Sequence, residues 1–419
     1  MTMHFSAWAS RFIGQTGTRM LMDDLGEALE SDRDVCNLGG GNPAQIPAMQ
    51  QVFQDLMQRQ IDDGTFSRLS SVYDGPQGHQ PFLRAVAGLF RRRYGWEITA
   101  DNVAVTAGSQ SSFFILFNLL TGTGADGRAR HLRLPLTPEY IGYADLTASP
   151  AAIKSARPRI DRLAEHSFKY AIDFDQFVLD DDTGAVCVSR PTNPTGNVIS
   201  SLELAQLLAL TRTADVPLII DNAYGAPFPQ IVFAQAEPVF EPHVIYCMSL
   251  SKLGLPGLRT GIVIARAEII DAIRSFNAVL SLASGSLGAS LVTPMFESGE
   301  VLRLANEVVR PYYEARVKQA VNWCNRYFAG LDFQIHKPEG AIFLWLWFPG
   351  LPLSAASLYQ RLKRRNVLII PGHFFFPGLD EPWQHMHECM RISYAQSPRE
   401  VEQGIRIVAE EVRRAFAAD

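Results

Sequence analysis

Residues 244–265, VIYCMSLSKLGLPGLRTGIVIA, place a polar cluster between two short apolar runs. The runs 244–249 and 259–265 lack the alternation of half-exposed strands, which predicts strands covered on both faces of a sheet. A lysine that directly follows such a strand is partly desolvated, so its pKa falls and the neutral amine needed for Schiff-base formation is favoured. An arginine and two hydroxyls beside it suit a phosphate dianion. The residues of this cluster are Ser249, Ser251, Lys252 and Arg259.

The same apolar texture recurs along the chain and predicts an α/β fold with a mostly parallel central sheet. The runs with this texture are VAVTA (103–107), AVCVS (185–189) and PLIID (217–221). After residue 300 the pattern changes to a helical stretch (302–328), a strand (341–348) and two further helices (354–365 and 398–416). We therefore expect a large domain at 48–305 and a smaller α+β domain built from 1–47 and 306–419.

Composition excludes several classes of protein. The 419 residues are 47% hydrophobic and 19% charged, which excludes disorder and a coiled coil. The net charge of −5 gives no electrostatic footprint for nucleic acid or for an anionic membrane. The most apolar runs, 113–120 and 341–348, are far shorter than the roughly 20 residues of a membrane-spanning helix. Five cysteines without a CxxC pair predict reduced thiols and a cytoplasmic protein.

Three further segments carry candidate ligand-binding residues, each with a structural alternative. In VTAGSQSS, the backbone N–H groups of Ser109 and Gln110 fall at the start of a predicted helix, where phosphate binds well, although Ser109 also suits an N-cap. Tyr140 follows a predicted strand and can stack on a planar ring or pack in the core. The turn NPTG can aim Asn193 at a ligand or serve as a turn alone.

The segment PLIIDNAYGAPF ends an apolar strand with a carboxylate. Burial of Asp221 is costly unless a cation or several donors meet it, and a protonated ring nitrogen is such a cation. Tyr224 lies three residues on and can donate to an oxygen of the same ring. The alternative is that Asp221 caps the next helix.

Taken in chain order, GSQ, PEY, NPTG, DNAY and SLSKLGLPGLR resemble the motifs of class I and II aminotransferases. The resemblance covers nearly the whole chain and implies the fold type I architecture of enzymes that depend on pyridoxal 5′-phosphate (PLP). It implies that Lys252 carries the cofactor as a Schiff base and that Asp221 pairs with the pyridine nitrogen. It also implies that Asn193 and Tyr224 contact the phenolic oxygen and that Tyr140 stacks on the ring.

The remaining roles also follow from the resemblance. The implied phosphate contacts are Ser109, Gln110, Ser249, Ser251 and Arg259. Arg391, in HECMRISYA, matches the arginine that binds the substrate α-carboxylate, and Gly40 and Gly41 match a loop that closes over the substrate. Tyr73, in YDGPQG, matches a tyrosine that family homodimers lend to the partner subunit's phosphate. One departure is that Arg259 follows Lys252 by seven residues, whereas many members place the arginine one residue later.

The resemblance implies a transaminase that exchanges an amino group between an amino acid and a 2-oxo acid by ping-pong chemistry, with Lys252, Asp221 and Tyr224 as catalytic residues. Members that take dicarboxylates often use a second arginine roughly thirty residues after the phosphate arginine, and the stretch 277–290 holds no cation. A distal carboxylate would lack a partner there, unless His373 or Lys337 reaches the pocket. We therefore expect small apolar donors, valine or alanine, with pyruvate or 3-methyl-2-oxobutanoate as the acceptor.

Two other functions stay open at this stage. A lyase of the same fold would keep every cofactor contact, because a fold does not fix the reaction. A transcription regulator would need a DNA-binding unit before the aminotransferase-like pattern, which begins by about residue 38 and leaves little space. A metal site is not expected, because the polar cluster His373, His385, His387 and Cys389 lacks the paired spacing typical of zinc.

Overall fold

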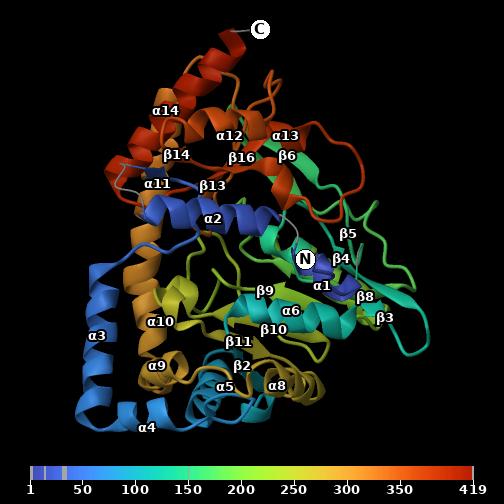
Figure 1. The fold of residues 1–419 in the computed structure, drawn as a ribbon, viewed down its shortest axis with the longest axis vertical. Coiled ribbons are helices and arrows are strands. Elements are labelled where there is room, and N and C mark those ends of the chain that lie inside the picture. The colour runs from blue at the N-terminus through green and yellow to red at the C-terminus, as the bar shows by residue number, and fades with distance from the viewer. Residues whose placement is uncertain (1–2, 14–15, 31–34, 150, 418–419) are drawn as a thin grey trace.

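The structure is a computed structural model that describes residues 3–13, 16–30, 35–149 and 151–417 (Figure 1). The strands of its central sheet lie in the order β2-β11-β10-β9-β8-β4-β3, and β5 also pairs with β4. Pairing from β10 through β9 and β8 to β4 and β5 is parallel, whereas β11 is antiparallel to both neighbours. The predicted mostly parallel sheet is therefore confirmed. The bounds are β2 (Val103–Thr106), β3 (Gly122–Thr123), β4 (Ala129–Leu134), β5 (Ile153–Ser155), β8 (Thr183–Ser189), β9 (Leu218–Asp221), β10 (Val244–Ser249) and β11 (Gly261–Ile264).

Continuous apolar runs form these strands because helices cover both faces of the sheet. In β9, Ile219 packs into one apolar cluster, whereas its neighbours Leu218 and Ile220 pack into another. The first cluster takes in α6 (Ser109–Leu120) and α8 (Ala267–Ser281). The second takes in α5 (Gln80–Tyr94), α7 (Ser201–Thr213) and α9 (Leu287–Ser298). Alternate side chains thus bury against opposite helix layers.

A second sheet lies in the part of the molecule built mainly from the C-terminal residues. Its order is β15-β16-β13-β12-β7-β6, so a hairpin from the middle of the chain completes it. Its strands are β6 (Arg159–Ala164), β7 (Ser167–Ala171), β12 (Gln334–His336), β13 (Phe343–Trp347), β15 (Ile370–Pro371) and β16 (Cys389–Ser393). The helices of this part are α11 (Arg310–Tyr327), α12 (Ala355–Lys363), α13 (His385–Glu388) and α14 (Pro398–Ala417). Helix α10 (Glu300–Leu304) and a π-helical turn (Ala305–Val309) lead from α9 into α11.

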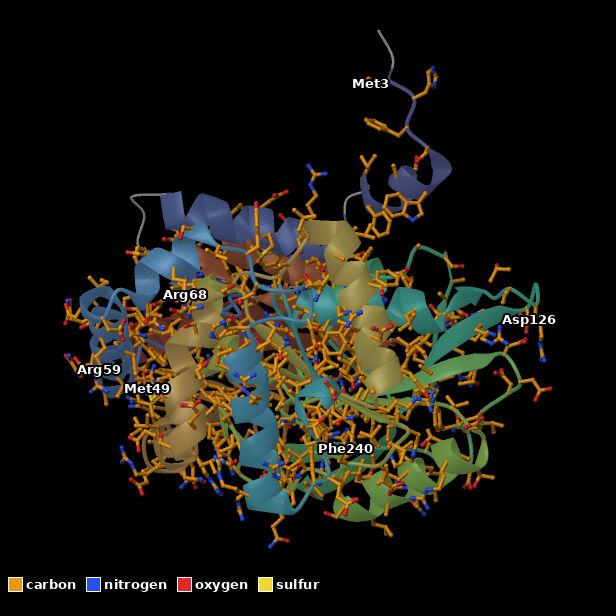
Figure 2. The ribbon with its side chains drawn as sticks, turned by 90° about the horizontal axis from the view of Figure 1, so that it is seen from below. Met3, Met49, Arg59, Arg68, Asp126 and Phe240 are labelled. Carbon is orange, nitrogen blue, oxygen red and sulfur yellow. The ribbon has the colours of Figure 1, made fainter. Side chains whose placement is uncertain are left out.

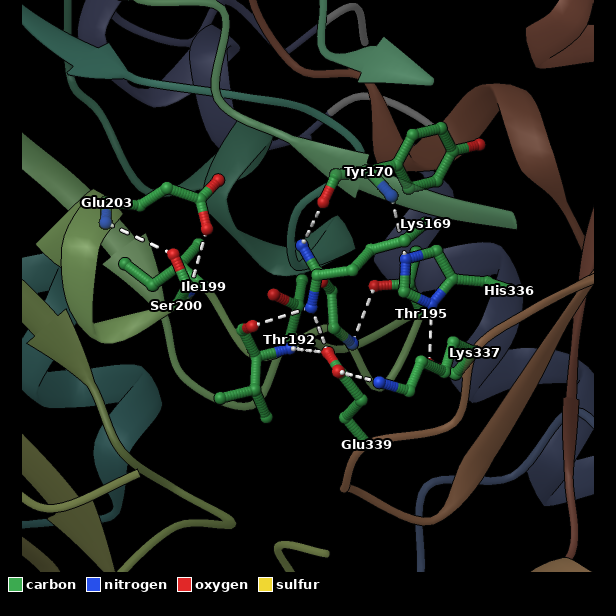
Figure 3. A network of polar contacts seen from close by, with 12 residues as sticks. Lys169, Tyr170, Thr192, Thr195, Ile199, Ser200, Glu203, His336, Lys337 and Glu339 are labelled. Carbon is green, nitrogen blue, oxygen red and sulfur yellow. Dashed lines mark hydrogen bonds and ion pairs between the residues drawn. The ribbon is translucent and has the colours of Figure 1, made fainter. Parts of the chain in front are cut away.

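A buried carboxylate ties the β6–β7 hairpin to both parts of the molecule (Figure 3). The carboxylate of Glu339 pairs with Lys169 of β7, and Lys337 Nζ lies 2.9 Å from it. It also accepts a hydrogen bond from the backbone N–H of Val198 (3.2 Å), while Lys169 Nζ donates to the Val198 carbonyl (2.8 Å). Val198 follows the NPTG turn, so this network fixes that turn against the second sheet.

The N-terminal residues cross between the two parts before the large domain begins. Helix α2 (Gly17–Glu30) runs above the central sheet (Figure 1), and β1 (Cys36–Asn37) pairs with β14 (Val367–Leu368). Two helices then follow, α3 (Pro47–Asp62) and α4 (Thr65–Ser71). The segment with Met3 at its end, which leads into α1 (Ala7–Ile13), extends away from the body (Figure 2), and Phe5 and Trp8 are exposed. None of the helices in the described residues has the length and apolar character that a bilayer crossing requires.

Candidate active site

A cavity of about 650 Å³ opens where the predicted site residues meet. It lies beyond the carboxyl ends of β8, β9 and β10, the edge at which α/β sheets bind ligands. Segments far apart in sequence line it, including α2, the start of α6 and strand β16. The predicted residues among its lining are Gly41, Ser109, Gln110, Tyr140, Asn193, Asp221, Tyr224, Ser249, Ser251, Lys252, Arg259 and Arg391.

Asp221 is the last residue of β9 and has two hydrogen-bond donors. Its Oδ2 accepts from the Tyr143 hydroxyl (2.8 Å) and its Oδ1 from the backbone N–H of Ala223 (3.0 Å). Burial nevertheless raises its pKa to about 6, so the carboxylate is only partly compensated and suits a cation in the cavity. No helix follows β9 directly, which rules out the helix-cap alternative for Asp221.

Lys252 follows β10 in a single 3₁₀ turn (Ser251–Leu253). Its Nζ donates to the Gly41 carbonyl (2.5 Å) and lies 5.4 Å from the centroid of the Tyr224 ring. Burial, together with the charges of Arg391 and Arg259, lowers its pKa to about 8. The amine is therefore far more readily deprotonated than a surface lysine, as the sequence predicts.

The start of α6 forms a cradle for an anion. Gly108 precedes the helix with φ +92°, and a Cβ at this position would collide with the Arg259 guanidinium. Gly108 occupies the N-cap position, so Ser109 is the first helical residue rather than the cap. The backbone N–H of Ser109 is among those left without a helical acceptor. Ser249 Oγ and Ser251 Oγ lie 2.9 Å apart on the same side of the cavity.

Arg391 lies on β16 with its guanidinium at the cavity. Nη1 donates to Asn193 Oδ1 (2.7 Å) and Nη2 to the Gly39 carbonyl (2.6 Å), and the guanidinium carbon lies 4.1 Å from the Phe343 ring centroid. Its buried Nε has no hydrogen-bond partner within the described part of the chain. Burial lowers the pKa of Arg391 to about 10, which leaves it charged at neutral pH. Such a group has donors to offer a carboxylate.

The chemistry of these donors fits PLP. The cradle of α6, Arg259 and the two serines offers cationic and N–H or O–H donors to a phosphate, and the Gln110 Oε1 beside it is buried without a partner in the described residues. Asp221 supplies the buried acceptor that a protonated ring nitrogen needs. Lys252 supplies an amine whose pKa is lowered toward neutrality.

Two predicted residues lie outside the cavity lining. Gly40 is buried next to Gly41, and its N–H donates to Asn37 Oδ1 (3.0 Å). Tyr73, after α4, is 81% exposed, so its predicted reach into a partner subunit stays a prediction. The stretch 277–290 does not line the cavity of its own chain either. Among the described residues, no group of three His, Cys, Asp or Glu gathers where a metal ion would bind.

Several residues of the site escaped the sequence analysis. Thr18 and Met22 of α2 line the cavity, although nothing in their segment predicts a ligand. Tyr143 and Ser189 stand next to Asp221, and Ser189 also contacts the buried Glu139. The one available signal was Glu139 itself, a carboxylate in the otherwise weakly polar stretch PLTPEYIGY.

Comparison with known proteins gives a consistent result. The sequence profile of class I and II aminotransferases matches residues 33–408. The valine–pyruvate aminotransferase of Escherichia coli strain K12 is 49% identical over 415 residues, which cover 99% of each chain. The crystal structure of valine–pyruvate aminotransferase from Salmonella typhimurium LT2 matches with a TM-score of 0.89 and 48% identity, covering 96% of this chain and 100% of that one. A Psychrobacter arcticum 273-4 structure assigned to the amino-acid aminotransferases matches with a TM-score of 0.96 and 41% identity over 100% of both chains.

The motifs, the cavity and these relatives agree, and the expected fold type I architecture and PLP dependence come with the family. This chain belongs to the class I and II aminotransferases.

Proposed function

We propose that this aminotransferase moves an amino group between a small apolar amino acid, valine or alanine, and a 2-oxo acid, pyruvate or 3-methyl-2-oxobutanoate. The observation that carries the proposal is the charge of the cavity. Of the described residues that line it, the cations are Lys252, Arg259 and Arg391, and each already has a role toward the cofactor or the α-carboxylate. None is left to pair with a second substrate carboxylate.

Lys337 and His373, the two residues considered above as partners for a distal carboxylate, lie elsewhere. Lys337 pairs with Glu339, and the ring of His373 stacks on that of His387, with centroids 5.8 Å apart. Neither residue lines the cavity. A distal carboxylate would be desolvated there without a partner, at a cost of several kcal/mol. An isopropyl group instead gains about 1.5–3 kcal/mol on full burial.

The names of two relatives support the same substrates. The Escherichia coli and Salmonella typhimurium proteins, at 49% and 48% identity, are valine–pyruvate aminotransferases. Apolar residues that line the cavity, Met22, Phe113 and Ile141, are compatible with a small aliphatic side chain.

Each side chain then has a task in the reaction. When bound, PLP supplies the electron sink that lets an amino acid and a 2-oxo acid exchange an amino group. Arg391 binds the substrate α-carboxylate, and Lys252 Nζ takes the proton from the substrate Cα and returns it as acid and base in turn. Asp221 holds the proton on the ring nitrogen. Asn193 and Tyr224 orient the phenolic oxygen of the cofactor, and the phosphate contacts anchor the cofactor in the cavity.

The active unit in this proposal is a cytoplasmic homodimer. Tyr73 and Val72 are exposed at 81% and 63%, and Val279, at the end of α8, is exposed at 88%. Large apolar side chains exposed to this degree favour coverage by another chain. A second copy would cover them and bring Tyr73 to the partner's phosphate in an isologous contact. Residues 48–305 would form the large domain, apart from the β6–β7 hairpin that joins the second sheet, and 1–47 and 306–419 would form the small one.

Initial rates test the substrate class. The purified enzyme is assayed with valine, alanine, aspartate and glutamate, each with a suitable 2-oxo acid. We expect kcat/KM to be higher for valine and alanine than for either dicarboxylate. A higher kcat/KM for aspartate or glutamate would contradict the apolar pocket, and release of pyruvate and ammonia from cysteine conjugates without transamination would indicate a lyase instead.

A further inference from the structure

A chain of buried oxygen atoms connects Asp221 to a second carboxyl group, Glu139. Asp221 Oδ2 lies 2.8 Å from the Tyr143 hydroxyl, which lies 3.2 Å from Ser189 Oγ, and Ser189 Oγ lies 2.5 Å from Glu139 Oε2. Glu139 and Tyr143 are fully buried, and Ser189 is 2% exposed. Asp221 borders the cavity, but the contacts among Glu139, Ser189 and Tyr143 are closed to bulk solvent, so protons of these groups have to satisfy them.

Counting protons shows that one carboxyl group is protonated. The three oxygen-to-oxygen contacts need one proton each. An ionised carboxylate only accepts, and a hydroxyl brings one proton, so Tyr143 and Ser189 supply two. With both carboxylates ionised, one of the three contacts would place two oxygen atoms together without a proton. The third proton must therefore belong to Asp221 or to Glu139.

The surroundings favour Glu139 as the protonated group. Asp221 lines the cavity together with the amine of Lys252, whose charge lowers the pKa of the carboxyl. No lysine, arginine or histidine of the described residues forms an ion pair with Glu139: its Oε1 accepts from the Ser189 N–H (2.9 Å) and its Oε2 from the Tyr140 N–H (3.3 Å). The titratable groups that interact with it electrostatically are Asp221 on β9, Cys187 on β8 and Tyr143. A second buried negative charge there would be uncompensated.

We propose that Glu139 is a protonated carboxylic acid and a positioning residue for the cofactor. Its proton begins a one-directional chain in which Glu139 donates to Ser189, Ser189 to Tyr143 and Tyr143 to Asp221. The chain keeps Asp221 ionised and fixes the orientation of its carboxylate toward the ring nitrogen. This inference rests on the proposed function in placing Asp221 against that nitrogen.

The direction of the pKa shifts agrees with the geometry. Burial, together with the charge of Asp221, raises the pKa of Glu139 to about 8, although the Ser189 side chain and N–H act to lower it. Burial raises the pKa of Asp221 less, to about 6. The larger rise at Glu139 supports placing the shared proton on Glu139 rather than on Asp221.

Infrared difference spectroscopy tests the protonation directly. Spectra of the wild-type holoenzyme and of Glu139→Gln are subtracted at neutral pH, in water and in deuterium oxide. We expect the wild type to show the C=O stretch of a protonated carboxyl group, absent from the variant and shifted by deuterium. A carboxylate stretch that disappears in the variant would show that Glu139 is ionised and would overturn the proposal.

Cofactor binding tests the positioning role. Glutamine can replace the protonated acid, because its amide oxygen accepts from the Ser189 N–H and its NH₂ donates to Ser189 Oγ. Glu139→Leu removes the donor, and we expect the PLP dissociation constant to rise about tenfold, the effect of one hydrogen bond to a charged group. Glu139→Gln should restore most of the affinity. Equal weakening in both variants would overturn the proposal.

A matched control separates positioning from a general loss of packing. Glu388 is also buried, accepting from Trp347 Nε1 (2.8 Å) and the Gly350 N–H (3.1 Å), and does not line the cavity. Glu388→Leu should therefore leave the PLP dissociation constant unchanged, and a tenfold rise there would contradict the specific role of Glu139. A wild-type protein that binds no PLP would contradict the proposed function instead, whereas the infrared result reports on Glu139 with or without the cofactor.

Discussion

At the scale of single residues, burial and charge together set the chemistry of Lys252. Burial alone disfavours a charged amine, and Arg259 and Arg391 add their repulsion to it. Asp221 opposes both effects with its negative charge. The outcome is an amine with a pKa of about 8, which holds a substantial neutral fraction close to physiological pH. A general base with such a pKa transfers protons efficiently in both directions.

Replacing this amine tests its role. Lys252→Ala should lower the rate of transamination by at least about 10²–10⁴-fold, the contribution of general acid–base catalysis. The phosphate cradle does not involve the amine, so the variant should fold and still bind the cofactor noncovalently. Steady-state rates and equilibrium dialysis with PLP measure both effects. Lys318→Ala, at an exposed helix position, is the control and should keep the wild-type rate. Turnover close to that of the wild type in Lys252→Ala would show that Lys252 takes no part in the mechanism.

Gly108 is a second position where a single added atom, a Cβ, is expected to change cofactor binding. Gly108 has a φ of +92°, and an alanine there would place its Cβ on the Arg259 guanidinium. We expect Gly108→Ala to weaken PLP binding about tenfold or more, because the cation is pushed away from the helix N-terminus. Gly95, at φ +70° with nothing within 4 Å of its Cβ position, is the matched control. Gly95→Ala should cost about 1–2 kcal/mol of stability without changing PLP affinity; equal PLP affinities of the two variants would contradict the cradle.

The sequence predicts the residues that bear directly on the ligand better than those behind them. Lys252 and Asp221 stand at the ends of apolar strands, where a charge is conspicuous because its burial needs a partner. Tyr143 and Ser189 carry no such signal, since a buried hydroxyl is ordinary in a core. Ser189 lies beside Asp221 because β8 pairs with β9, and Tyr143 reaches Asp221 from the separate turn Ile141–Asp145. Sequence spacing contains neither arrangement.

At the scale of elements, the β6–β7 hairpin holds the two parts of the molecule together. In the sequence the hairpin lies between β5 and β8, which belong to the central sheet. Its strand β7, however, pairs with β12 of the second sheet. This pairing was not predicted, because strand partners so far apart in sequence are set by tertiary packing and leave no periodic signal. The continuous strands and amphipathic helices were predictable because their patterns are local.

The Glu339 network gives this connection a measurable stability. Burial acts to raise the pKa of Glu339, but the hydrogen bond and charge of Lys169 and the charge of Lys337 outweigh it, so the pKa lies below its ordinary value of 4.5. Glu339→Gln should lower the free energy of unfolding by about 1–3 kcal/mol at neutral pH. Its contribution is present above the unfolded-state pKa and is lost as pH falls through the folded-state pKa. Wild type and variant should therefore converge in acid.

Chemical denaturation at several pH values measures this difference. Glu314→Gln, which removes an exposed pair with Lys318, should change the free energy of unfolding by less than about 0.5 kcal/mol. If the effect of Glu339→Gln were as small as that of Glu314→Gln, or grew as pH falls, the network would not stabilise the connection.

At the scale of the whole molecule, residues far apart in the sequence line one cavity. Residues between 109 and 259 supply most of the lining, β16 supplies Arg391 and α2 supplies Thr18 and Met22. In a single chain Tyr73 is 81% exposed, and the proposed homodimer would bring it to the partner's phosphate site.

Subunit mixing tests the shared site. A Tyr73→Phe chain is combined with a Lys252→Ala chain, so that each heterodimer holds one native site and one doubly altered site. We expect activity per native site to approach that of the wild type, because the intact Tyr73 comes from the Lys252→Ala chain. Activity no higher than the average of the two parent homodimers, or a monomer in sedimentation analysis, would contradict the shared site.

The central claim is that this cavity carries PLP through two half-reactions with apolar substrates. Its most direct test is the visible absorbance of the purified protein after loading with PLP, recorded during stepwise addition of substrates. Valine alone should remove the visible band with release of one 2-oxo acid per active site, and pyruvate added after removal of valine should restore it. A band that valine leaves unchanged, or that pyruvate fails to restore, would contradict the claim.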